Sequence, residues 1–312
     1  MSEARERLAA SAFLLVNVEL PEETSIEEQP IAQQLGLEAE ELTWLGKDGE
    51  PVRAEFLGDR AGFVVPVVDQ GQVTHIHAVA TDRYLVTVHR GVAEVTESLT
   101  ARFRHERPSD AVALLFLLLQ EALETFRRSA VQALLAVEGL EDEMFQGRRP
   151  EQVYRLAQLR RQAALLHRTL LPYAQVTDDI VTRRMMSGRF PEEHQRLAHA
   201  FQHAARMVMT DIETLQDAAR RTFASYSSLV SGEQNGVINR LAIVSTIFLP
   251  LTFLTGFFGM NFTYLTDELE SKAVFWLLAV GLQVSVLFVA FYVLHRTRIW
   301  RRLRDEEGLD DR

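Results

Sequence analysis

Residues 250–262 read Pro-Leu-Thr-Phe-Leu-Thr-Gly-Phe-Phe-Gly-Met-Asn-Phe. They contain the end of the stretch of sequence that decides the fold. That stretch covers residues 241–260 and contains no charged residue. At about 1.5 Å per residue, a helix of this length crosses the hydrocarbon core of a bilayer, which is about 30 Å thick. A second run without charge covers residues 273–294. The sequence therefore predicts two transmembrane helices in a protein that has the lipid bilayer as a partner.

The charges around these two runs predict how the chain is oriented. The connecting loop, residues 261–272, holds Asp267, Glu268 and Glu270 against the single basic residue Lys272. The residues that follow the second run are strongly basic: His295, Arg296, Arg298, Arg301, Arg302 and Arg304. Because basic flanks remain on the cytoplasmic side, we expect a multi-pass protein of the cytoplasmic (inner) membrane with both termini in the cytoplasm and the acidic loop outside.

Composition excludes several classes of function. The 312-residue chain has no cysteine, which excludes disulfides, thiolate metal sites and thiol catalysis. Its net charge of -10 argues against a nucleic-acid partner, since such proteins need a basic surface. The chain also lacks a glycine-rich phosphate loop and a nucleophile elbow. We therefore expect a protein that is not an enzyme and has neither cofactor nor catalytic residues.

The first hundred residues have the pattern of a small α+β domain. Short apolar runs bounded by turn residues predict five strands, and one amphipathic segment, residues 33–45, predicts a helix. The predicted strands cover residues 12–18, 52–56, 62–68, 73–80 and 84–89. From Ser109 the period becomes helical, and Pro150 at a helix start predicts a hairpin of helices over residues 109–146 and 150–171.

A long helix is predicted to begin near Pro191, after a break at residues 187–191. Its apolar positions follow alternating steps of four and three, which is the pattern of a heptad seam that packs on a neighbouring helix. The seam contains Phe201, Ala205, Val208, Ile212, Leu215, Ala219, Thr222, Tyr226 and Leu229. Gly232 and Gly236 resemble a turn and weaken a continuous helix by about 1 kcal/mol each.

A second line of residues runs along the first transmembrane segment with the same steps. It contains small or polar side chains around one leucine: Ser245, Leu249, Thr252 and Gly256. Ser245 lies 16 residues after Leu229, which at about 100° per residue places the two lines about 160° apart on one helix. Polar groups facing lipid are costly, so the line either faces a water-filled pore or packs tightly against another helix. The residues alone leave these two alternatives open.

Two pairs of histidines have spacings that can hold a metal. His199 and His203 are four residues apart on the predicted long helix, and His75 and His77 share one face of a predicted strand. Neither pair has a third ligand nearby in the sequence, so we interpret both as ordinary surface or core residues.

The end of the first transmembrane segment carries the residues that suggest a family. Gly259-Met260-Asn261, preceded by Thr-Ile-Phe-Leu-Pro-Leu-Thr-Phe-Leu-Thr-Gly at 246–256 and followed by a short acidic loop, resembles the signature of the CorA family of magnesium channels. The resemblance implies a funnel-shaped homopentamer whose first transmembrane helices surround a central pore. It also implies a filter in which a ring of Asn261 contacts the hydrated ion through its water shell, while Gly259 and Met260 hold the backbone.

The same resemblance assigns pore-lining positions and a cargo. It implies that Asn235, Leu241, Leu249 and Thr252 line the pore, and these fall on or beside the line that also holds Ser245 and Gly256. The acidic loop is expected to raise the local concentration of cations. A ring of neutral amides suits Mg²⁺, which gives up its water reluctantly, and would also admit Co²⁺ and Ni²⁺. The chain departs from the family pattern at Thr263, where Glu is frequent, and in a loop that is one residue longer.

Two alternatives remain beside a magnesium channel. The ZntB branch of zinc transporters is similar in sequence, although the aromatic pair Phe262 and Tyr264 favours the CorA side. A membrane-anchored sensor or scaffold would have the same two spans without conducting ions. In each case the expected organisation is an N-terminal cytoplasmic α/β domain, a helical hairpin, a stalk helix that continues into the membrane, a loop with the filter, a second transmembrane helix and a basic, then acidic, cytoplasmic tail. These parts cover residues 1–105, 106–190, 191–260, 261–272, 273–294 and 295–312.

Overall fold

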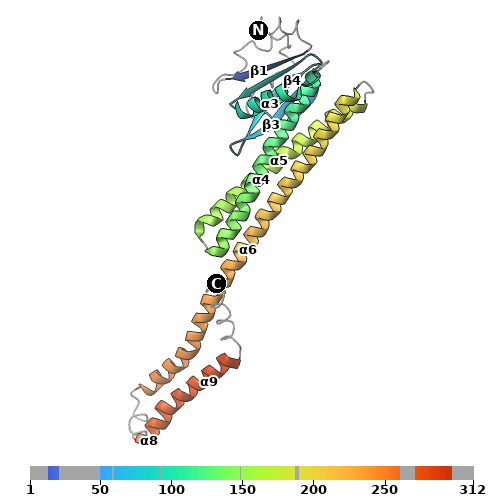
Figure 1. The fold of residues 1–312 in the computed structure, drawn as a ribbon. Helices are drawn as coiled ribbons and strands as arrows, with labels where there is room; N and C mark the ends of the chain where they lie inside the picture. The colour runs from blue at the N-terminus through green and yellow to red at the C-terminus, as the bar shows by residue number, and fades with distance from the viewer. Residues whose placement is uncertain are drawn as a thin grey trace. The chain divides into compact units, whose positions relative to one another are not determined.

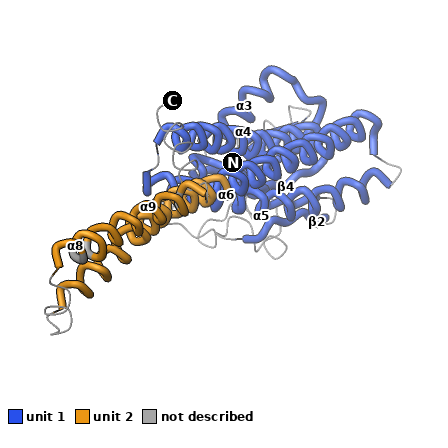
Figure 2. The backbone as a smooth tube through the Cα atoms, turned by 90° about the horizontal axis from the view of Figure 1, so that it is seen from below, with its two compact units in different colours: residues 1–223 blue, residues 224–312 orange. Residues whose placement is uncertain are grey.

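The structure, a computed structural model, divides the chain into two units, residues 1–223 and 224–312, which are described separately (Figure 2). It describes residues 13–20, 50–57, 60–91, 93–147, 149–186, 190–260 and 271–296. The helix predicted at residues 33–45 lies outside these ranges, as do Asn261 and the loop acids Asp267, Glu268 and Glu270.

The first unit contains a five-stranded sheet, and all five predicted strands are confirmed with their ends shifted by a few residues (Figure 1). The strands are β1 (Leu14–Leu20), β2 (Arg53–Leu57), β3 (Arg60–Asp69), β4 (Gln72–Ala80) and β5 (Tyr84–Arg90). Their order is β1-β5-β4-β3-β2, with β1 parallel to β5 and the other pairs antiparallel. Gln70 and Gly71 both have positive φ, which suits the two-residue turn between β3 and β4.

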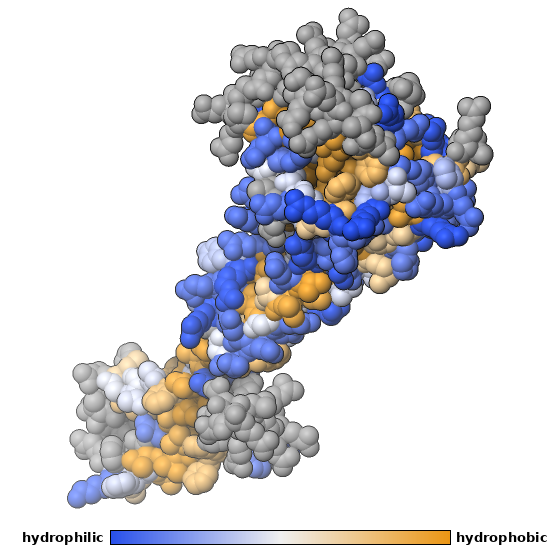
Figure 3. Space-filling view, turned by 45° about the horizontal axis from the view of Figure 1, so that its top comes forward, coloured by the Kyte–Doolittle hydropathy of each residue, from blue (hydrophilic) through white to orange (hydrophobic). Residues whose placement is uncertain are grey.

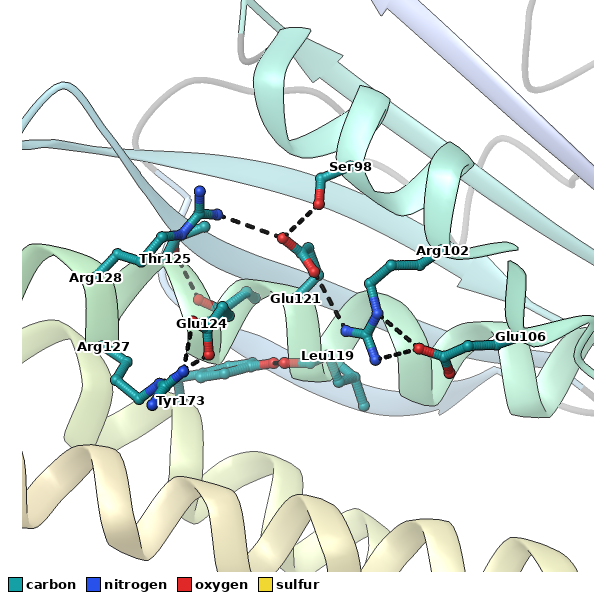
Figure 4. A network of polar contacts seen from close by, with 11 residues as sticks. Ser98, Arg102, Glu106, Leu119, Glu121, Glu124, Thr125, Arg127, Arg128 and Tyr173 are labelled. Carbon is teal, nitrogen blue, oxygen red and sulfur yellow. Dashed lines mark hydrogen bonds and ion pairs between the residues drawn. The ribbon is translucent and has the colours of Figure 1, made fainter. Parts of the chain in front are cut away.

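A helix that the sequence analysis did not predict follows the sheet. This helix, α3 (Ala93–Glu106), packs on α4 (Ala111–Gln146) around the buried carboxylate of Glu121 (Figure 4). Glu121 accepts hydrogen bonds from Ser98 Oγ at 2.8 Å and from Arg102 Nη1 at 3.2 Å. Burial tends to lower the pKa of Arg102, but hydrogen bonds and charges from Glu106 and Glu121 outweigh it and raise that pKa. A buried charge needs such partners, and they hold α3 on α4.

The helical hairpin is confirmed, and its second helix is longer than predicted. Asp110 caps α4 by accepting from the backbone N–H of Ala113 at 2.8 Å. Helix α5 covers Pro150–Met186 and therefore continues 15 residues past the predicted end at 171. Pro172 does not end the helix, because it lies on the exposed side, where water can reach the carbonyl that loses its partner. The buried Tyr173 beside it donates to the carbonyl of Leu119 on α4 at 3.1 Å.

The predicted long helix is confirmed as one element, α6 (Glu192–Phe258). It passes through Gly232 and Gly236 without a break. Within the first unit its heptad seam is buried from Phe201 to Thr222, as the pattern predicted. Thr222 is tolerated there because its hydroxyl donates to Glu141 on α4 at 3.1 Å. Tyr226 and Leu229, which belong to the second unit, are half-buried.

The second predicted span is helical throughout but not regular. It consists of α8 (Lys272–Val274), a π-helix (Phe275–Gly281) and α9 (Leu282–Arg296). The sequence analysis predicted a helix over residues 273–294 and did not predict its π-helical part.

The seam predicts a measurable difference between two apolar residues of α6. Ile212 is fully buried, whereas Met207 is 51% exposed. Ile212→Ala should destabilise the first unit by about 2–5 kcal/mol through lost burial and an unfilled cavity. Met207→Ala, the matched control, should leave the midpoint of thermal unfolding of the full chain in detergent nearly unchanged. Equal shifts for the two variants would mean that the seam does not stabilise this unit.

Candidate functional site

Two helical stretches in the described part of the chain are long and apolar enough to cross a membrane. One lies in α6 and the other covers residues Trp276–Val293. Residues 224–258 of α6 and all of the second stretch belong to the second unit. Figure 3 shows apolar side chains gathered along the described surface of this unit, whereas the first unit presents many hydrophilic side chains on the same view. Large exposed apolar side chains such as Phe248, Phe253 and Phe288 are expected where lipid or other protein surrounds a helix.

One face of α6 packs on α9 within the chain. The residues of that face that are half-buried include Ile243, Ile247, Pro250 and Leu254. Thr246 and Pro250 line a groove of about 400 Å³ together with Val286, Val289 and Ala290 of α9. Ala290, which also lines this groove, is 7% exposed.

The line of small and polar residues lies on the other side of α6. Ser245, Thr252 and Gly256 are exposed in the single chain, and Leu249 is 71% exposed. Ser245 and Leu254 are nine residues apart, which at about 100° per residue places them on opposite sides of the helix. Leu241 and Asn235, the two further pore-lining candidates, are also exposed.

This arrangement removes one explanation for the line of small residues. Small residues in membrane helices often allow a neighbouring helix to approach closely. In this chain the neighbouring helix α9 packs on the opposite face, so it does not account for Ser245, Thr252 and Gly256. The hydroxyl of Thr252 donates to the carbonyl of Phe248 at 2.8 Å, which satisfies its proton but leaves its oxygen able to accept.

The structure describes the candidate site as far as Met260, one residue before Asn261. Helix α6 ends at Phe258, and the N–H of Gly259 donates to the carbonyl of Thr255 at 3.0 Å. A Cβ on Gly259 would lie 3.0 Å from that carbonyl oxygen, so glycine suits this close turn. The N–H of Met260 donates to the carbonyl of Phe257 at 3.3 Å. Gly259 and Met260 thus continue the last turn of the helix toward Asn261.

A polar contact between the two membrane-length helices was not predicted. Gln283 of α9 donates through Nε2 to the hydroxyl oxygen of Thr255 on α6 at 3.3 Å. Gln283 interrupts an apolar run, and such an interruption was the signal in the sequence that could have indicated a partner.

The histidine pairs of the first unit do not form metal sites with other ligands among the described residues, where no cluster of three candidate ligands occurs. His199 is exposed and contacts Gln202 Oε1 through Nδ1 at 3.2 Å. His77 is buried in β4, and burial lowers the pKa of its neighbour His75. Both observations agree with ordinary surface and core roles.

Comparisons with known proteins converge on one family. A family model described as "CorA-like Mg2+ transporter protein" matches residues 11–298. The cobalt/magnesium transport protein CorA of Thermotoga maritima is 26% identical over 225 residues, covering 70% of this chain and 62% of that protein. The zinc transport protein ZntB of Yersinia enterocolitica is 28% identical over 159 residues, covering 50% of this chain and 46% of that protein. The matches therefore span less than two thirds of these curated relatives.

A solved structure shares the fold over nearly the whole chain. The CorA magnesium transporter of Methanocaldococcus jannaschii superposes with a TM-score of 0.76 at 19% identity, covering 91% of this chain and 90% of that one. At this level of identity the likeness concerns the fold alone.

Proposed function

The chain belongs to the CorA-like Mg²⁺ transporter family, whose model matches residues 11–298, and from this premise we propose that it carries hydrated divalent cations, chiefly Mg²⁺, across the cytoplasmic membrane. Five copies would surround a central pore, with both termini in the cytoplasm and the loop of residues 261–272 outside. The observation that carries the proposal is the exposure of the small, polar line of α6 on the side opposite α9.

A pore explains that exposure in physical terms. Ser245, Thr252 and Gly256 present hydroxyls, a backbone and little bulk, which favours water over lipid. In a ring of symmetric copies the same face of every α6 can meet at one axis. Leu241 and Leu249 would form apolar rings in such a pore, and apolar constrictions can close by losing their water. The described part of this line contains no His, Asp or Glu, so it offers no strong ligand for a transition metal.

The proposed filter lies directly after the turn at the end of α6 in the sequence. With Gly259 and Met260 continuing that turn, five Asn261 side chains would meet at the mouth of the pore. An amide carbonyl can accept hydrogen bonds from the water shell of Mg²⁺ without displacing the water, which this small ion releases reluctantly. The neutral ring holds the ion weakly enough for it to move on. Asp267, Glu268 and Glu270 would raise the local concentration of cations outside.

The filter assignment predicts the effect of one substitution. Asn261→Ala should reduce Mg²⁺ uptake into proteoliposomes to background, because the hydrated ion loses its ring of acceptors. The variant should still assemble with five subunits, as measured by size-exclusion chromatography with light scattering, and Thr263→Ala serves as a control in the same loop. Normal uptake by assembled Asn261→Ala would contradict the filter, and a monomeric or dimeric wild type would favour a non-conducting scaffold.

The cargo can be identified by competition. A filter of neutral oxygens distinguishes poorly among hydrated divalent ions of similar size, so Co²⁺ and Ni²⁺ should inhibit Mg²⁺ uptake in proportion to their concentration. Uptake of Zn²⁺ that excludes Mg²⁺ would instead indicate the zinc transport named for the ZntB relatives.

A further inference from the structure

We propose that Gln283 is a positioning residue for transport: acting through Thr255, it holds the end of α6 from which Gly259, Met260 and Asn261 extend. This inference rests on the proposed function, because it concerns how the filter is held. It adds a residue of the second membrane-length helix to a site that is otherwise built from the first helix and the loop.

The contact joins the two helices within two stretches whose sequences are mostly apolar. Thr255 Oγ1 donates to the carbonyl of Leu251 at 2.8 Å and accepts from Gln283 Nε2 at 3.3 Å, so the hydroxyl is used in both directions. The residues around Gln283 are apolar, with Leu282 and Val284 on either side and Val286 one turn later. An amide in such surroundings is costly unless it finds a partner, and that cost opposes separation of the helices at this level.

Thr255 also connects this contact to the filter. Its carbonyl oxygen accepts the N–H of Gly259 at 3.0 Å, and a Cβ on Gly259 would lie 3.0 Å from the same oxygen. Thr255 therefore accepts a hydrogen bond from Gln283 with its side chain and one from the N–H of Gly259 with its backbone carbonyl. Asn261 lies two residues after Gly259. A shift of Thr255 would consequently move the turn from which the filter extends.

The π-helix sets the direction in which Gln283 points. Its wide i→i+5 turns rotate all later side chains away from the positions that a continuous α-helix would give them. The segment ends at Gly281, two residues before Gln283. The carbonyl of Gly281 then accepts from Ser285 Oγ at 2.8 Å as the regular helix resumes. The irregular turn thus immediately precedes the residue that reaches α6, and π-turns often occur where a helix serves a function.

A contact that only stabilises the fold would use the same hydrogen bond as a positioning contact, but the two roles change different measured quantities. A stabilising contact affects how much protein inserts and how well it resists heat. A positioning residue also changes how the assembled protein handles its ion. The half-saturating Mg²⁺ concentration, measured on equal amounts of inserted protein, separates these roles because it does not depend on yield.

The test uses the full chain in proteoliposomes with Mg²⁺ as the probe. Thr255→Val and Gln283→Met each remove the contact with little change in volume. Both should raise the half-saturating Mg²⁺ concentration about three- to tenfold, the range expected from one interhelical hydrogen bond. The double variant should show no greater rise than either single variant, because the two residues act through one contact. Gln283→Asn keeps the amide but shortens its reach, and should show the same rise.

The control variants distinguish loss of this contact from loss of a hydroxyl elsewhere in the two helices. Thr255→Ser keeps the hydroxyl and should restore wild-type values. Thr246→Val and Ser285→Ala remove hydroxyls that donate to carbonyls of their own helices, at Ala242 and Gly281, and should leave half-saturation unchanged. Wild-type half-saturation in assembled Thr255→Val and Gln283→Met would overturn the positioning role while leaving the proposed function intact. A wild-type chain that transports no divalent cation would contradict the proposed function itself, and this inference with it.

Discussion

The structure depends on the need to satisfy polar groups in an apolar surrounding. In the membrane-length part of α6, the apolar face that includes Ile243, Ile247 and Leu254 packs toward α9, and the small, polar face is left exposed on the opposite side. Lipid does not solvate such a face, so water or another copy of the chain must cover it. A ring of copies with water at its axis would cover this face with both water and neighbouring copies. The other features of the proposed site follow from that arrangement.

The same constraint operates inside the first unit, where paired polar groups stabilise the packing of helices. Glu121 is buried between α3 and α4, and the side chains of Ser98, Arg102 and Arg128 surround its carboxylate (Figure 4). Thr222 keeps its place in an otherwise apolar seam because Glu141 accepts its proton. Glu121 and Thr222 each have a partner on another helix, and each such pair helps to fix how two helices pack.

Much of the fold could be predicted from periodicity. Five strands, the hairpin and the heptad seam of α6 have strong local patterns, and the structure confirms them. The misses have physical causes. Helix α3 is short and partly polar, so its pattern is weak. Helix α5 continues past the predicted end at residue 171 because Pro172 lies on its exposed side. The π-helix and the contact between Gln283 and Thr255 depend on how two helices meet, which one sequence does not reveal. The position of Asn261 remains a prediction from its motif.

The central claim is that the line Ser245–Leu249–Thr252–Gly256 faces water. The chain has no native cysteine, so single substitutions to Cys at these four positions can be compared with Cys at 243, 247, 250 and 254. Thiol reagents act on the thiolate, which forms where water is present. Small water-soluble reagents applied from both sides of proteoliposomes should modify the four positions of the line quickly and block Mg²⁺ uptake, while the other four react slowly. Reactivity without this periodicity, or strongest at 247 and 254, would contradict the account.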